Sequence, residues 1–237
     1  MKIFDENVAR KVATTIAVGD DESFLIDSFV EVCRFLSQNQ SSLSWRGENK
    51  PSVFTQEGLN ELAKSYFAGY RRSDLPAEPS TVPDEMVSVI MSEFYGYSDS
   101  DCQRIQIEHQ RSMCAENCVG NLLERYINSM LKEEGWFWCC GDFVKAIDFL
   151  SNDDEGQWFA LQIKNRNNSE NSSSSAIRNN TTIQKWFRSF SKDTKKGRPS
   201  FTNWDNLPPL MQGYNLSEQG FKEFVLKYVR DRQLKNN

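Results

Sequence analysis

The sequence lacks the features that mark membrane and secreted proteins. No uninterrupted apolar run approaches the ~20 residues that a membrane-spanning helix needs. The N-terminal residues, MKIFDE, carry acids where a signal peptide would have its apolar stretch. The 237 residues have a mean hydropathy of -0.62 and are 38% hydrophobic, which is ordinary for a soluble chain able to bury a sizeable core. We therefore expect a cytoplasmic protein with no membrane partner.

Histidine is nearly absent, since His109 is the only one. The six cysteines are expected to be thiols, because a cytosolic chain of this size rarely relies on disulfides. Cys114, Cys118, Cys139 and Cys140 match no familiar zinc-binding spacing, and the last two would point to opposite faces of a strand. Buried thiols are therefore favoured over a zinc site.

Positive charge is scarce in the first two thirds of the chain and abundant afterwards. Residues 1–156 contain 14 Lys and Arg against 27 Asp and Glu, a balance of -13, whereas residues 157–237 contain 14 against 6, a balance of +8. Residues 164–198 alone hold nine basic residues and two acids. The net charge of -5 by itself argues against a nucleic-acid partner, but this uneven distribution predicts one face suited to a polyanion.

Residues 1–117 are expected to form a mainly helical region, which could serve as a dimerisation or DNA-clamping lobe. Apolar residues from Phe24 to Leu36 recur at helical spacing, and Thr55 is placed to cap a second helix. Residues 74–83 contain three prolines and read as a connector, after which residues 84–95 resume as helix. We find no internal repeat.

Residues 118–237 show a different pattern and form either a second domain or a continuation of the first. An apolar helix stripe beginning at Cys118 is stopped by Gly135, and Ser217 is placed to cap a final helix. The order is helix, three strands and helix, so the predicted fold class is α/β (α+β) with an N-terminal helical region and a sheet flanked by helices. The expected strands are 136–140, 143–150 and 158–164, and the helix after them contains Ile183, Trp186, Phe187 and Phe190.

Three polar residues in the second and third strand-like runs, Asp148, Gln162 and Lys164, are expected to meet on one sheet surface. Side chains alternate across a strand, so Gln162 and Lys164 project to the same face. The turn-rich sequence SNDDEG separates the two runs, and in a hairpin of this length the partner strand brings Asp148 close to the pair. A match of this kind is weak alone, because such strings occur by chance and an Asp can be a simple edge carboxylate.

This cluster has the donor types that phosphodiester hydrolysis needs. Asp148 supplies an anionic oxygen for Mg²⁺, which lowers the pKa of bound water. Lys164 places a cation beside the scissile phosphate and can orient the attacking water. Gln162 offers a neutral oxygen that can ligate Mg²⁺ but adds no charge, so a second metal would require another acid.

Glu124 is the best candidate for that second acid. It lies at the border of the apolar stripe on the helix that begins near Cys118, from which it could reach the sheet. A solvated or salt-bridged helix residue is an equally good interpretation. Asp142 and Glu155 are weaker alternatives, because both are expected in turns.

The hairpin with Asp148 and Gln162-Ile163-Lys164, continuing into Asn165–Ser169, resembles type II restriction endonucleases of the SinI kind. The recognisable stretch runs from Gly120 to Pro209. This resemblance implies a PD-(D/E)xK nuclease core of mixed β-sheet and helices within residues 118–237, Mg²⁺ dependence and cleavage of double-stranded DNA at GGWCC. It also implies a cognate DNA methyltransferase that acts on the same site without stable binding.

Two residues depart from the broader superfamily pattern. Ile147 stands where proline often precedes the aspartate, and Gln162 stands where an acid is usual. The second departure leaves open the number of metals and whether Glu124 compensates. It also motivates a rival function, a catalytically degenerate DNA-binding protein. A structure-specific repair nuclease or junction resolvase is another rival, and a helical protein-interaction domain would account for the first hundred residues alone.

The basic region after the third strand is expected to hold DNA. Base edges carry the sequence information, whereas phosphate contacts provide affinity. Arg166 and Arg178 suit guanine edges, and Lys185 and Arg188 are expected on the polar side of the following helix. A solvated face or a disordered linker are the alternatives for this stretch. The full set of predicted DNA-contacting residues is Arg166, Asn167, Arg178, Lys185, Arg188, Lys195, Lys196 and Arg198.

A nearly symmetric site cut on both strands requires two active sites related by a twofold axis. We therefore expect a homodimer. The aromatic-rich helices of the first hundred residues could provide its interface, although core packing explains them equally well.

Overall fold

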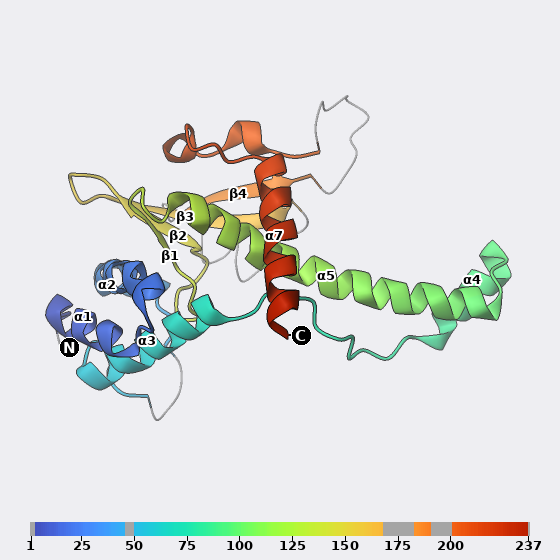
Figure 1. The fold of residues 1–237 in the computed structure, drawn as a ribbon, viewed down its shortest axis with the longest axis horizontal. Coiled ribbons are helices and arrows are strands. Elements are labelled where there is room, and N and C mark those ends of the chain that lie inside the picture. Colours follow the sequence, from blue (N-terminus) through green and yellow to red (C-terminus); the bar gives the residue numbers. More distant parts are fainter. Residues whose placement is uncertain (1–2, 46–49, 168–182, 191–200, 237) are drawn as a thin grey trace.

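The computed structural model describes residues 3–45, 50–167, 183–190 and 201–236. Across these residues the chain forms helices and a four-stranded mixed sheet, which confirms the predicted α+β class (Figure 1). None of the helices in the described ranges is long and apolar enough to cross a bilayer. The main elements are α1 Glu6–Ile16, α2 Ser23–Gln38, α3 Gln56–Arg71, α4 Glu85–Tyr95, α5 Asp99–Leu131, β1 Trp136–Trp138, β2 Phe149–Asn152, β3 Trp158–Arg166, β4 Ile183–Ser189 and α7 Glu218–Asn236.

Helices α1, α2 and α3 form the expected N-terminal helical region. Thr55 caps α3 as predicted, since its side chain accepts a hydrogen bond from the N–H of Gly58. The Tyr66 ring is fully buried, and its hydroxyl donates to the carbonyl of Trp138 at 2.8 Å, which joins α3 to β1. Gly69 permits this close packing, because a Cβ there would lie 1.7 Å from a backbone oxygen of the segment after β1.

The sheet has the strand order β1-β2-β3-β4. The pairs β1–β2 and β2–β3 are antiparallel, and β4 runs parallel to β3. In this register Phe149 faces Leu161, whereas Gln162 faces Lys185 across the parallel pair.

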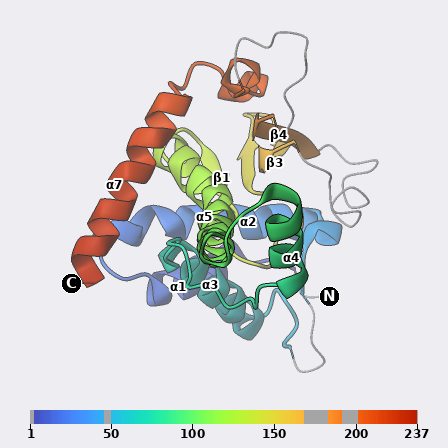
Figure 2. The ribbon, with the colours of Figure 1, turned by 90° about the vertical axis from the view of Figure 1, so that its right-hand side faces the viewer.

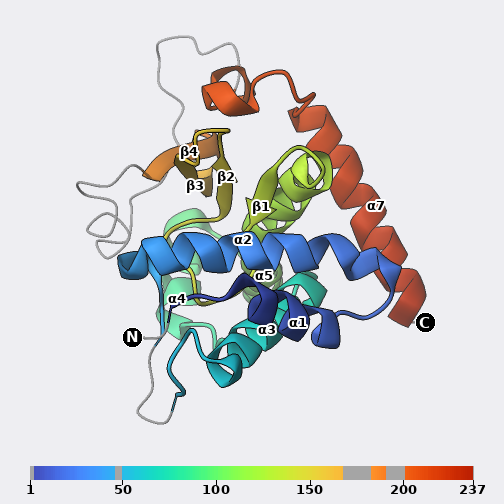
Figure 3. The ribbon, with the colours of Figure 1, turned by 90° about the vertical axis from the view of Figure 1, so that its left-hand side faces the viewer.

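The two sheet faces contribute to different parts of the core. Leu150 and Ala160 pack in the cluster formed with α1, α2 and α3, and Figure 3 shows these helices beside the strands. Phe149, Leu161 and Ile163 belong instead to the cluster formed with α5 and α7. Helices therefore pack against both faces of the sheet.

The helix predicted around residues 183–190 is wrong, because residues 183–189 form strand β4. Ile183 packs in the cluster with α2, while Trp186 packs in the cluster with α5 and α7. Apolar side chains on both faces of a doubly covered strand mimic helical spacing over so short a run. Lys185 and Arg188 consequently belong to a strand, not to the polar side of a helix.

The second predicted strand was also too long, since β2 contains only Phe149–Asn152. The preceding residues bond to the N-terminal region instead: the N–H of Ser44 donates to the Phe143 carbonyl at 2.7 Å. Ala146 has φ +55°, a left-handed conformation that interrupts an extended run. Helix α5 likewise differs from its prediction, because it begins at Asp99 and not near Cys118.

The final helix, α7, starts where the sequence predicts. Ser217 caps it by accepting a hydrogen bond from the N–H of Gly220 at 3.1 Å. Its residues Phe221 and Phe224 pack on the ring of Tyr126 from α5. Figure 1 shows α7 crossing α5, and this contact ties the C-terminus to the helix that lies against the sheet.

Candidate active site

Asp148 lies immediately before β2, at the end of the sheet. Its N–H donates to the Leu161 carbonyl and its carbonyl accepts from the N–H of Cys139, both at 2.8 Å, so the backbone is fixed on two sides. Its carboxylate accepts a hydrogen bond of 2.6 Å from the N–H of Ile163, the middle residue of the Gln-Ile-Lys triplet. The carboxylate and the triplet are therefore brought together.

Gln162 and Lys164 occupy alternate positions of β3 and share a face. Gln162 is buried with 3% of its surface exposed, whereas Lys164 is half-buried. Lys185 of β4 is the register partner of Gln162, so it lies on the same face. The parallel pairing thus adds a second amine beside Lys164 that the sequence placed on a helix.

Glu124 projects from α5 toward the same end of the sheet. The indole Nε1 of Trp138 donates to its carboxyl at 2.9 Å and fixes its direction. Burial and then the nearby Asp148 carboxylate raise the pKa of Glu124 to about 8, against the lowering effects of the Trp138 hydrogen bond and of Arg72. Without a bound cation, the Glu124 carboxyl is mainly protonated near neutral pH.

Burial raises the pKa of Asp148 to about 6, while the Ile163 N–H and the Lys164 ammonium act in the opposite direction. Burial and then the Lys164 ammonium lower the pKa of Lys185. The site therefore contains an acidic pair next to a basic pair. A bound cation would reduce the repulsion between the carboxylates of Glu124 and Asp148, and a bound anion would reduce the repulsion between the ammonium groups of Lys164 and Lys185.

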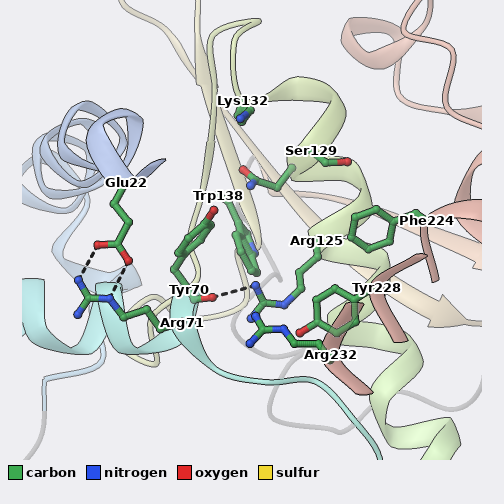
Figure 4. A pocket seen from close by; sticks show the side chains of 11 residues that line it. Glu22, Tyr70, Arg71, Arg125, Ser129, Lys132, Trp138, Phe224, Tyr228 and Arg232 are labelled. Carbon is green, nitrogen blue, oxygen red and sulfur yellow. Dashed lines mark hydrogen bonds and ion pairs between the residues drawn. The ribbon is translucent and has the colours of Figure 1, made fainter. Parts of the chain in front are cut away.

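Arg125, the residue after Glu124, anchors this part of α5. It is buried and forms an ion pair with the equally buried Asp74, and it donates to the carbonyls of Tyr70 at 2.8 Å and Arg72 at 2.6 Å. Its guanidinium also lies 5.2 Å from the ring centroid of Trp138. Figure 4 shows Arg125 among these aromatic residues at the wall of a cavity of about 480 Å³.

The sequence interpretation missed Trp138, Arg72 and Arg125 as supports of the site. Arg125 offered one signal, because a charged pair with Glu124 interrupts an otherwise apolar helix stripe. Nothing in the sequence links Arg125 to Asp74, which lies 51 residues earlier. Trp138 orients Glu124 directly, whereas Arg125 anchors the helix that carries Glu124, and both do so through contacts that only tertiary structure creates.

The predicted DNA-contacting residues fall into two groups. Arg178, Lys195, Lys196 and Arg198 lie outside the described residues.

Arg166 and Asn167 are exposed at the end of β3, where Arg166 pairs with Glu116 of α5 at 3.4 Å. Arg188 is held inside the protein, since it donates to Asn165 at 2.8 and 3.0 Å and to Glu218 at 2.5 Å.

The weaker acid candidates, Asp142 and Glu155, are exposed in turns. All six cysteines are free thiols, four of them buried. Over the described ranges, no group of three or more His, Cys, Asp or Glu side chains is arranged to hold a metal. The acid pair of Glu124 and Asp148 would therefore need neutral oxygens to complete a metal site, and Gln162 is the predicted residue that offers one.

The sequence is similar to known restriction enzymes over most of its length. The family model of the SinI restriction endonucleases matches residues 9–231. The type II restriction enzyme Eco47I of Escherichia coli is 42% identical over 208 residues, which cover 86% of this chain and 87% of that enzyme. The type II restriction enzyme SinI of Salmonella infantis is 40% identical over 208 residues, which cover 87% of this chain and 88% of that enzyme.

Proposed function

Because the chain belongs to the SinI restriction endonuclease family and is therefore a type II restriction enzyme, a site-specific deoxyribonuclease, we propose that it hydrolyses double-stranded DNA at GGWCC with Mg²⁺. The match extends far beyond the stretch that carried the initial resemblance, and it confirms that family prediction. It also favours a restriction enzyme over a repair nuclease or resolvase. The recognition sequence rests on the resemblance.

One observation supports the choice of catalytic residues most directly. The Asp148 carboxylate is bonded to the N–H of Ile163, between Gln162 and Lys164, and the Lys164 ammonium lowers its pKa against the raising effect of burial, so the acid lies against the strand that carries the amide and the amine. Glu124 reaches the same place from α5 and is oriented by Trp138. The second acid, which the strand lacks, therefore comes from a helix.

The chemistry of this donor set fits Mg²⁺. Asp148 and Glu124 would hold the ion with Gln162 as a neutral ligand, because hard cations prefer carboxylate and amide oxygens. When bound, Mg²⁺ supplies Lewis acidity at the phosphate and lowers the pKa of water. Lys164 would stabilise the negative charge that develops on the phosphate and orient the attacking water. Glu124 must lose its proton to bind the ion, so Mg²⁺ affinity should rise with pH up to about 8.

DNA would lie across the basic end of the sheet. Lys185, beside Lys164, suits a backbone phosphate, whereas exposed Arg166 and Asn167 at the end of β3 suit base edges. Arg188 instead stabilises the strand that carries Lys185 through its contacts with Asn165 and Glu218. The remaining proposed DNA contacts are Arg178, Lys195, Lys196 and Arg198, which lie outside the described residues.

Cutting both strands of a nearly symmetric DNA site requires two active sites related by a twofold axis, so we propose that the enzyme is a homodimer. It would act in the cytoplasm on DNA that the cognate methyltransferase has left unmodified, without a stable complex between the two proteins.

Digestion of a plasmid of known sequence tests the function. With Mg²⁺ the protein should give discrete fragments whose mapped ends coincide with GGWCC. Lys164→Ala should lower the single-turnover cleavage rate at least about 100-fold while leaving DNA binding in Ca²⁺ largely intact. Lys64→Ala, an exposed lysine of α3, is the matched control. Tight DNA binding without hydrolysis would identify a degenerate DNA-binding protein. Fragments whose ends do not coincide with GGWCC would refute the proposed recognition sequence.

A further inference from the structure

The hairpin formed by α4 and the first half of α5, residues 84–115, projects from the body of the protein (Figure 1). We call this segment the arm. Seventeen helical residues at about 1.5 Å each give its α5 portion a length of roughly 25 Å. Figure 2 looks along the arm and shows α4 lying beside α5. None of the eleven residues of α4 is buried.

The two helices of the arm contact each other through polar groups. Ser88 of α4 accepts a hydrogen bond of 2.7 Å from the amide of Gln106, and the same amide approaches the carbonyl of Asp84 at 3.5 Å. The thiol of Cys102 points to the carbonyl of Ser88 at 3.8 Å. The inner face of α4 is therefore the hydrogen-bonded one.

The opposite face of α4 is apolar and exposed. Met86, Ile90 and Phe94 follow one another at four-residue spacing, about 160° around the helix from Ser88, and are 59%, 60% and 78% exposed. A helix that belonged to a monomer would bury such a row and leave its polar face in water. This inverted arrangement indicates that another apolar surface covers the arm.

The exposed apolar area of the whole arm is comparable to that of a stable protein interface. Together the exposed apolar side chains of α4, of the turn after it and of the first half of α5 offer on the order of 600 Å². A standard interface buries about 800 Å² per partner, of which roughly 500 Å² is apolar. The contributing residues are Met86, Val87, Val89, Ile90, Phe94, Tyr95, Tyr97, Ile107 and Met113.

Charge excludes DNA as the occupant. The arm has six Asp and Glu against two Arg and no Lys, and phosphates would be repelled by that excess. We propose that the arm docks on the arm of a second copy of this chain, with α4 against α4 about a twofold axis. The choice of a second copy rests on the proposed function, because a twofold DNA site needs two active sites. A twofold contact uses the same patch on both copies, which a single apolar row such as Met86, Ile90 and Phe94 satisfies.

Sedimentation velocity of the full chain without DNA tests this proposal. The wild-type protein should be a dimer at micromolar concentration, and Ile90→Glu should raise the dimer dissociation constant at least about 100-fold, because it places two like charges at the apolar centre. Leu226→Glu on α7 is the matched control, since Leu226 is also helical and 47% exposed, and it should remain dimeric. Circular dichroism should show all of these proteins folded, because the substituted side chains are exposed.

A charge-complementation experiment sharpens the test. Ile90→Lys alone should also be monomeric, and mixing it with Ile90→Glu should restore a heterodimer. A monomeric wild type, an Ile90→Glu dimer as stable as that of the control, or no recovery in the mixture would each overturn the α4-to-α4 contact. A wild-type dimer that lacks DNA cleavage would instead refute the proposed function and leave the interface standing.

Discussion

Replacing Glu124 with Gln should remove a pH-dependent destabilisation that the wild-type site carries. The folded protein binds the Glu124 proton more tightly than the unfolded chain, because burial and the Asp148 charge raise this pKa from 4.5 to about 8. A raised carboxyl pKa lowers stability progressively as pH rises from about 4.5 to about 8, and the full penalty applies above that. Glutamine keeps the shape of the side chain and has no proton to lose.

The magnitude follows from the same pKa. At about 1.36 kcal/mol for each tenfold change in acid dissociation, the rise from 4.5 to about 8 corresponds to roughly 5 kcal/mol for an isolated group. Glu124 keeps some contact with solvent and titrates together with Asp148, so we expect about half of this. The unfolding free energy of Glu124→Gln relative to wild type should therefore increase by about 2 kcal/mol between about pH 5 and about pH 9.

Urea denaturation in EDTA at these two pH values measures the difference. Glu108→Gln is the matched control, because Glu108 is an exposed residue of the same helix. Adding Mg²⁺ at high pH should stabilise the wild type more than Glu124→Gln, since a ligand stabilises the state that binds it. Identical pH dependence in both proteins would refute the burial of this acid, and equal stabilisation by Mg²⁺ would refute its role as a ligand.

Two further substitutions test the acid and its support. Asp148→Ala should eliminate Mg²⁺-dependent cleavage in the plasmid assay, and full residual activity would transfer the metal-binding role to Asp142 or Glu155. Asp74→Ala should lower the unfolding free energy by about 3–5 kcal/mol, because it leaves Arg125 buried without its carboxylate. This corresponds to a loss of roughly 6–20 °C in Tm by calorimetry, and an unchanged Tm would show that the ion pair does not hold α5.

Local signals in the sequence predicted the parts of the fold that depend on neighbouring residues. Thr55 and Ser217 cap α3 and α7 because a side-chain oxygen next to an apolar helix stripe satisfies free backbone N–H groups. The meeting of Asp148 with Lys164 was predictable for a similar reason, since a short antiparallel hairpin connects their strands.

Contacts between distant residues could not be read from the sequence. Strand β4 carries apolar residues such as Ile183 and Trp186 on both faces, and only its place beside β3 distinguishes that pattern from a helix. The ion pair between Arg125 and Asp74 joins α5 to a connector that reads as an irregular, proline-containing loop. The hairpin that carries Asp148, Gln162 and Lys164 could therefore be predicted, but the strand that carries Lys185 and the contacts that hold Glu124 near the hairpin could not.

The glutamine at position 162 becomes understandable once the position of Glu124 is considered. Gln162 is 3% exposed and precedes Ile163, whose N–H bonds to the Asp148 carboxylate. An acid at position 162 would add a third carboxylate to the proposed site, where the pKa of Glu124 is already raised to about 8. A third buried carboxylate would add to the repulsion between Glu124 and Asp148 and would bring a further cost of desolvation. A neutral amide retains an oxygen for the cation and avoids that cost. In the proposed site the acid that the strand lacks would be Glu124 of α5, which the Trp138 indole orients and whose helix is anchored by the Arg125–Asp74 pair.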